Sequence, residues 1–158
     1  VLLPFFYYNV FGKADRGKKI FMGDTGSLTL GYVLSFLAVR YSMYEPEVRP
    51  YNDGAIVIAF SALIVPVFDV VRVILLRIRN KKSPFLPDKN HIHHKFLAIG
   101  FSPRAAMLII IAIACAFCAS NILLIGDVDK TALLLVDITI WIAFHLYLDK
   151  RIKERKRN

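Results

Sequence analysis

The sequence predicts an all-α, polytopic integral membrane protein, and two observations lead to this class. Hydrophobic residues make up 56% of the 158 residues, yet the formal net charge is +9. Soluble domains intersperse their basic residues along amphipathic elements. Here the basic residues gather in short stretches between long apolar ones, which is the pattern of repeated membrane crossing. Because only a helix satisfies its backbone within one such crossing, we expect helices.

The apolar segments define the expected helices in order. Residues 1–11 read as the end of one segment, and four longer segments follow at 28–44, 54–76, 105–125 and 132–148. At about 1.5 Å per residue, each of the four can cross a hydrocarbon core of about 30 Å. Polar residues mark the expected helix starts, namely Asp24, Thr25 and Ser27, then Asp53-Gly54, then Ser102-Pro103. We therefore predict about four full transmembrane helices in a single membrane domain over 1–158.

Basic residues predict the orientation of these helices. They are concentrated before the first helix, between the second and third, and in a basic tail at 149–158. The 44–53 and 126–130 connections carry one each, Arg49 and Lys130. Since basic loops stay on the cytoplasmic side, we place the three basic regions there, namely the one before the first helix, the one between the second and third helices, and the tail. The tail fits a topology anchor, and no motif indicates a nucleic-acid partner.

Asp24 is the candidate metal ligand of the loop at residues 21–27. Mg²⁺ prefers one or two carboxylates together with phosphate oxygens and water, so one exposed aspartate at a helix start suits it. Helix capping is the plain alternative for Asp24. No Gly-Lys-Ser/Thr follows, which excludes a nucleoside-triphosphate P-loop.

A second polar segment, which we call the histidine loop (residues 88–95), carries His91, His93 and His94. Zinc binding is one alternative, but the loop has no nearby cysteine or paired acidic ligand to complete a zinc site. A solvated basic loop is a further alternative. Imidazoles that donate to phosphate or sugar hydroxyls fit better, with Lys89 and Lys95 adding charge. Prolines at 84 and 87 argue against a helix through the loop.

Four charged residues lie inside the apolar segments, and one of them, Arg40, is near a helix end, where it can snorkel. Asp69 and Arg72 are three apart and share a helix face, so they form either a mutual ion pair or part of a site. Asp137 is also expected within the membrane, and the sequence indicates no partner for it.

Three motifs together resemble a known family. They are Lys19 to Ser27 (KIFMGDTGS), Pro66 to Arg72 (PVFDVVR) and His91 to Lys95 (HIHHK). This order is similar to the polyprenyl-phosphate N-acetylhexosamine-1-phosphate transferases, and the His-x-His-His pattern resembles the bacterial undecaprenyl-phosphate N-acetylglucosamine-1-phosphate transferase subgroup. The resemblance covers roughly residues 5–100.

The resemblance implies a reaction and a set of site residues. Undecaprenyl phosphate attacks the β-phosphorus of UDP-N-acetylglucosamine and UMP leaves, which initiates cell-envelope glycan synthesis. Asp24 aligns with the magnesium ligand, where Mn²⁺ is a possible substitute. Phe21 aligns with an aromatic that stacks on uracil, and Asn9 with a nucleotide contact. The three histidines of the loop contact the diphosphate and sugar, and Arg72, Lys89 and Lys95 are the further candidates for substrate binding.

One departure from the family pattern concerns paired aspartates, which this chain lacks. We therefore expect the chain to be the carboxyl-terminal part of a larger transferase and to be inactive alone. The expected location is the bacterial inner membrane, with the site on the cytoplasmic face and a homodimer left open. A transporter or channel is the rival class, although its binding site is expected near mid-membrane.

Overall fold

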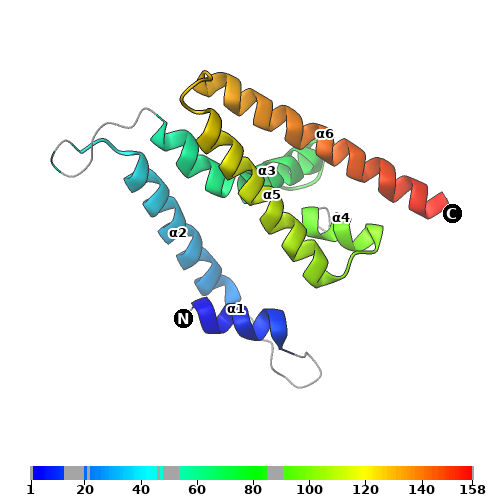
Figure 1. The fold of residues 1–158 in the computed structure, drawn as a ribbon. Helices are drawn as coiled ribbons and strands as arrows, with labels where there is room; N and C mark the ends of the chain where they lie inside the picture. Colours follow the sequence, from blue (N-terminus) through cyan, green and yellow to red (C-terminus); the bar gives the residue numbers. More distant parts are fainter. Residues whose placement is uncertain are drawn as a thin grey trace. The chain divides into compact units, whose positions relative to one another are not determined.

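The computed structural model describes residues 2–12, 20, 22–45, 47, 54–84 and 91–157. Its regular elements there are the helices α1 (Leu2–Phe11), α2 (Gly23–Ser42), α3 (Ala55–Arg79), α4 (Ile92–Ile99), α5 (Pro103–Leu124) and α6 (Lys130–Arg157) (Figure 1). The all-α prediction is confirmed. The helices group into two compact units, Val1–Tyr41 and Ser42–Asn158, and each is described by itself. The single domain over 1–158 stays a prediction.

The first unit contains α1 and most of α2. Helix α2 begins at Gly23, so Asp24 lies in its first turn rather than before it. The hydroxyl of Ser27 donates to the carbonyl oxygens of Gly23 (3.1 Å) and Asp24 (3.0 Å) within that turn. The predicted capping role of Ser27 is therefore wrong, because its hydroxyl serves carbonyl groups and not the free N–H groups of the helix start.

Three helices, α3, α5 and α6, are long and apolar enough to cross a membrane. They correspond to the second, third and fourth predicted segments. Helix α2 has 20 residues but does not join them by this measure, since glycine, serine and threonine dilute its apolar sequence. The basic tail is not a separate segment, because α6 continues through it to Arg157. A multi-pass membrane protein is the class that these helices indicate.

The core of the second unit joins all four of its helices. Ile64 and Val65 of α3, Phe96 of α4, Phe117 of α5 and Trp141 of α6 are buried in one cluster. Helix α3 packs on α5, and the short α4 packs on both α5 and α6, as Figure 1 shows. This packing brings the described part of the histidine loop, His91 to Lys95, to the start of α4, which lies against α5 and α6.

Side chains set the starts of the last two helices. Ser102 accepts a hydrogen bond from the N–H of Ala105 (3.2 Å) and Pro103 occupies the first turn, which confirms the predicted cap of α5. Asp129 caps α6 in the same way, with its Oδ1 accepting from the N–H groups of Thr131 (2.9 Å) and Ala132 (3.0 Å). At α3 the N-cap is Gly54, without a side-chain bond.

The expectation of no helix through the histidine loop is wrong, because α4 begins inside it at Ile92. This helix starts beyond both prolines, and its apolar residues Ile92 and Phe96 are one turn apart and buried. The helix ends at Gly100, whose φ of +105° lies in the left-handed region that favours glycine. Arg155 of α6 approaches this end and donates to the carbonyl of Ala98 (3.4 Å).

Asp137 has partners that the sequence did not indicate. Asn121 of α5 donates from Nδ2 to Asp137 Oδ2 of α6 (2.8 Å) and to Ser61 Oγ of α3 (2.8 Å). Ser61 in turn donates to the carbonyl of Val57 (2.7 Å). These polar side chains are buried and link the three long helices in one network, as polar groups within membrane bundles commonly do.

Candidate functional site

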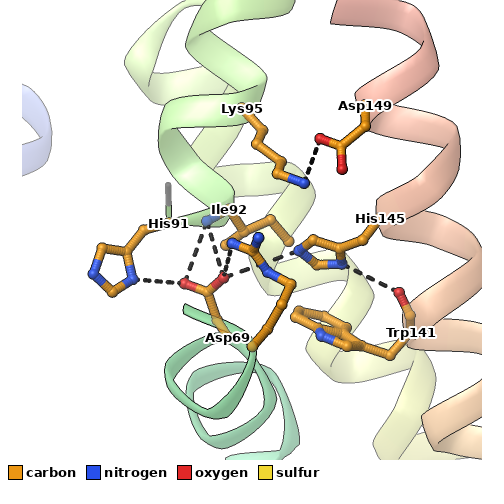
Figure 2. A network of polar contacts seen from close by, with 8 residues as sticks. Asp69, His91, Ile92, Lys95, Trp141, His145 and Asp149 are labelled. Atoms are coloured by element: carbon orange, nitrogen blue, oxygen red, sulfur yellow. Dashed lines mark hydrogen bonds and ion pairs between the residues drawn. The ribbon is translucent and has the colours of Figure 1, made fainter. Parts of the chain in front are cut away.

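Asp69 of α3 is the centre of a polar network that positions the histidine loop (Figure 2). Its Oδ1 accepts from Arg72 Nη2 (3.0 Å), so the two residues do form the ion pair that was one of the two alternatives for them. The backbone N–H of Ile92, at the start of α4, lies 3.1 Å from Oδ1 and 3.2 Å from Oδ2. His91 Nδ1 lies 2.9 Å from Oδ2. A carboxylate on one helix therefore caps another and binds the first imidazole of the loop.

The three imidazoles of the loop form one cluster at the start of α4. The rings of His91 and His93 are stacked, with centroids 6.0 Å apart and planes 10° from parallel. The centroids of His93 and His94 are 4.0 Å apart. The side chain of His93 is largely exposed, yet partial burial lowers its pKa, and the neighbouring His94 and His91 lower it further against the opposing effect of Asp69.

Lys95 follows the cluster but faces a different helix. Its ammonium group forms an ion pair with Asp149 of α6 (2.5 Å), and the residue is buried (Figure 2). Burial is the main cause that lowers the pKa of Lys95, and the hydrogen bond to Asp149 opposes this shift. Its predicted role as a phosphate ligand stays a prediction, and the partner it has in the structure is a carboxylate.

His145 of α6 lies on the other side of Asp69, with its Nε2 4.0 Å from Asp69 Oδ1. Its Nδ1 donates to the carbonyl of Trp141 (3.1 Å), since a carbonyl oxygen only accepts. The side chain is buried, with the ring of Trp141 against it at a centroid distance of 4.5 Å. Helix α6 thus approaches the network from the side of Asp69 opposite His91 (Figure 2).

A cavity of about 640 Å³ lies between α3 and α6 beside this network. Its walls are mainly apolar along both helices, from Phe60 and Leu134 onward. Arg79, Lys95 and Asp149 line it where these helices approach their carboxyl ends. The cavity therefore combines a long apolar wall with a charged end.

Of the remaining predicted site residues, two are described by the structure and two are not. Asp24 is exposed in the first turn of α2, and Asn9 of α1 donates from Nδ2 to the carbonyl of Phe5 (2.9 Å). Phe21 and Lys89 lie outside the described residues. Asp24 belongs to the first unit and the histidine cluster to the second. Their convergence on one substrate stays a prediction.

Sequence reasoning missed His145 and Asp149 and left the role of Asp69 open. A signal was present, because His145 and Asp149 are four residues apart at the end of an apolar helix and so share a face. Ionisable residues in such a position commonly face a bundle interior. Their partners on α3 and α4 are distant in the sequence and could not be read from spacing.

Comparisons with known proteins bear on this site. The family model described as "Glycosyl transferase family 4" matches residues 1–42. A probable undecaprenyl-phosphate N-acetylglucosaminyl 1-phosphate transferase of Bacillus subtilis (strain 168) is 42% identical over 122 residues, which are 77% of this chain and 31% of that protein. No solved structure matches the chain.

Relatives in other bacteria carry a similar name. The undecaprenyl-phosphate alpha-N-acetylglucosaminyl 1-phosphate transferase of Yersinia pestis is 30% identical over 93% of this chain and 36% of its own length. That of Escherichia coli (strain K12) is 33% identical over 75% of this chain and 30% of its own length. The chain thus spans about a third of the length of the curated relatives it matches. These similarities, together with the three sequence motifs, show that the chain belongs to glycosyl transferase family 4.

Proposed function

We propose that the protein containing this chain transfers N-acetylglucosamine-1-phosphate from UDP-N-acetylglucosamine to undecaprenyl phosphate and releases UMP. The relatives named above carry this activity in their names. The observation that supports it best is the imidazole cluster of His91, His93 and His94, which Asp69 anchors at the start of α4. Such a cluster provides several donors for an anionic diphosphate.

The proposed reaction forms one P–O bond and breaks another. An oxygen of the undecaprenyl phosphate attacks the β-phosphorus, and the bond from that phosphorus to the bridging oxygen breaks. UMP leaves with the electron pair, and the product is undecaprenyl-diphospho-N-acetylglucosamine. Phosphoryl transfer depends mainly on positioning and on stabilisation of charge, and imidazole donors facing the diphosphate supply both.

Magnesium is the proposed cofactor, and Asp24 is its proposed ligand. The carboxylate of Asp24 is exposed at the start of α2, which leaves it free to reach a hydrated ion. Among the described residues, no group of three His, Cys, Asp or Glu side chains could hold a metal. The support for Mg²⁺ is the exposed carboxylate, because this ion takes few protein carboxylates and completes its shell with phosphate oxygens and water. When bound, the ion would neutralise charge on the diphosphate.

The cavity between α3 and α6 is the proposed place for part of the lipid acceptor. A polyprenyl chain is apolar and its phosphate is anionic, and the cavity has apolar walls with Arg79 and Lys95 near one end. We expect Val71→Trp, which narrows the cavity, to raise KM for undecaprenyl phosphate and leave KM for UDP-N-acetylglucosamine unchanged. An unchanged KM for the lipid would remove the cavity from the proposal.

The proposed location is the inner membrane, with the site on the cytoplasmic face. The support is the alternation of connections rich and poor in basic residues along the chain. Cysteine labelling of full-length protein in intact cells tests this. A cysteine at Asp127, in the α5–α6 connection, should react with a membrane-impermeant reagent, and one in the basic tail should not. The reverse pattern would invert the proposed orientation.

The activity itself is tested with membranes that contain the full-length protein. We expect magnesium-dependent exchange of labelled UMP into UDP-N-acetylglucosamine when undecaprenyl phosphate is present. A panel of other UDP-N-acetylhexosamines tests the choice of sugar. Absence of exchange with all of them, together with a substrate-driven ion current, would support the transporter class instead.

Asp24→Asn in the full-length protein tests the proposed metal ligand. We expect turnover to be lost while expression and membrane insertion are unchanged, because an amide binds Mg²⁺ weakly. Asp127→Asn is the matched control, since Asp127 is also exposed but lies in the α5–α6 connection. Near-normal rates in Asp24→Asn would remove this residue from the site.

A further inference from the structure

Asp69 is a buried carboxylate that the proposed chemistry does not use directly. Only 9% of its side chain is exposed, while the side chain of His91 is 33% exposed. Three donors reach the two oxygens of Asp69, namely Arg72 Nη2, the N–H of Ile92 and His91 Nδ1. The contact to the N–H of Ile92 caps α4, so a substrate group that replaced it would remove the cap. Any influence of Asp69 on the reaction must therefore pass through the groups it holds.

The contact to His91 determines which ring nitrogen carries the proton. An ionised carboxylate has acceptors only, so the nitrogen 2.9 Å from Oδ2 must donate. In neutral His91 the proton is thus on Nδ1, and Nε2 presents a lone pair. In the charged form, Nε2 becomes a donor at the same place. Figure 2 shows the second nitrogen on the side of the ring that faces away from Asp69.

The same contact also orients the rest of the cluster. The ring of His93 is nearly parallel to that of His91, and His94 lies against His93. Among the described residues, His91 has a carboxylate oxygen within hydrogen-bond distance, whereas His93 and His94 are in contact with neighbouring rings. His91 is therefore the imidazole whose direction the fold controls through a fixed acceptor.

We propose that Asp69 is a positioning residue: it accepts from Nδ1–H of His91 and so directs Nε2 toward the diphosphate of the nucleotide sugar, to which Nε2 donates when the ring carries both protons. Asp69 does not touch the substrate. This inference rests on the proposed function for the identity of the substrate. It also assigns to the Asp69–His91 pair a role that capping α4 alone would not require.

Asp69→Asn separates positioning from capping. The amide oxygen of asparagine still accepts from the N–H of Ile92, and asparagine is a good capping residue, so α4 keeps its start. The amide nitrogen, by contrast, donates to Nδ1 of His91. The ring then cannot carry protons on both nitrogens while it keeps this contact, and its neutral form with the proton on Nε2 is favoured. Asp137→Asn is the matched control, because Asp137 is also a buried carboxylate, but its hydrogen bond is to Asn121 of α5 and not to a described residue of the histidine loop.

The kinetic experiment uses the full-length protein and a double-mutant cycle with His91→Ala. We expect Asp69→Asn to lower kcat for UMP release by about 10–100-fold with little change in KM, the size seen when residues that orient metal-bound histidines are replaced. In the His91→Ala background the same change should cost less than about 3-fold. Asp137→Asn should stay within about 3-fold of the unchanged enzyme. Equal losses in both backgrounds, or a normal rate in Asp69→Asn, would overturn the inference.

A second measurement does not depend on the reaction. The ¹⁵N chemical shifts of His91 in the full-length protein report its tautomer directly. We expect the Nδ1–H form in the unchanged protein and a shift toward the Nε2–H form in Asp69→Asn. Finding Nε2–H in the unchanged protein would refute the positioning role even if the enzyme is active. An Nδ1–H signature in a protein that shows no UMP exchange would instead reject the proposed function, while the interaction between Asp69 and His91 would still be supported.

Discussion

Asn121→Ala should destabilise the second unit by about 2–3 kcal/mol. The change removes both hydrogen bonds of Asn121 Nδ2, to Ser61 Oγ and to Asp137 Oδ2, each 2.8 Å long. Hydrogen bonds between membrane helices are worth about 0.6 kcal/mol on average and up to about 1.7 kcal/mol. Asp137 is then left buried without its donor, which adds about 1–2 kcal/mol.

The assay is unfolding of the full-length protein by SDS titration in mixed micelles. A cycle of Asn121→Ala, Asp137→Ala and the double variant isolates the pair, with an expected coupling of about 0.6–1.7 kcal/mol. Ser120→Ala is the control, because its hydroxyl donates only to the carbonyl of Phe117 within α5 (3.0 Å). An Asn121→Ala variant as stable as the Ser120→Ala control would refute the reasoning, as would two strictly additive single changes.

Three further predictions concern the histidine loop and the ends of its neighbouring helices. Gly100→Ala should destabilise by about 1–2 kcal/mol in the same titration, because φ is +105° there; an unchanged midpoint would contradict this. Ser102→Ala should cost about 1 kcal/mol through loss of the α5 cap, and Ser102→Asn should restore most of it. His94→Gln should raise the pKa of His93 toward its usual value but not reach it in an NMR titration, because burial is the larger cause. Since the folded protein binds the His93 proton less readily than the unfolded chain, acidification below the ordinary histidine pKa should lower stability, and less so in His94→Gln.

The helices were predictable because their signals are local. Apolar segments and the Ser102-Pro103 cap predicted α3, α5 and α6 to within a few residues at their starts. The start of α4 was not predictable in the same way. Its cap is Asp69, 23 positions earlier in the chain, and a helix of eight residues has little stability until a partner satisfies its first N–H groups.

The candidate site shows the same division. The residue types of the histidine loop and their family resemblance indicated a phosphate-binding cluster, and the comparisons confirm the family. The sequence could not indicate that Lys95 pairs with Asp149 or that His145 lies beside Asp69. Those contacts depend on how α4 packs between α5 and α6, which no spacing along one helix encodes.

The sequence by itself determined that this protein is a bundle of apolar helices with its ionisable groups gathered in a few short stretches. Hydrophobicity and helical periodicity are properties of neighbouring residues, so one chain suffices to read them. Only the tertiary structure decided which polar side chains meet. Asp69 with His91 and Asn121 with Asp137 are pairs that form because a polar group excluded from water takes whatever partner the packing brings within reach.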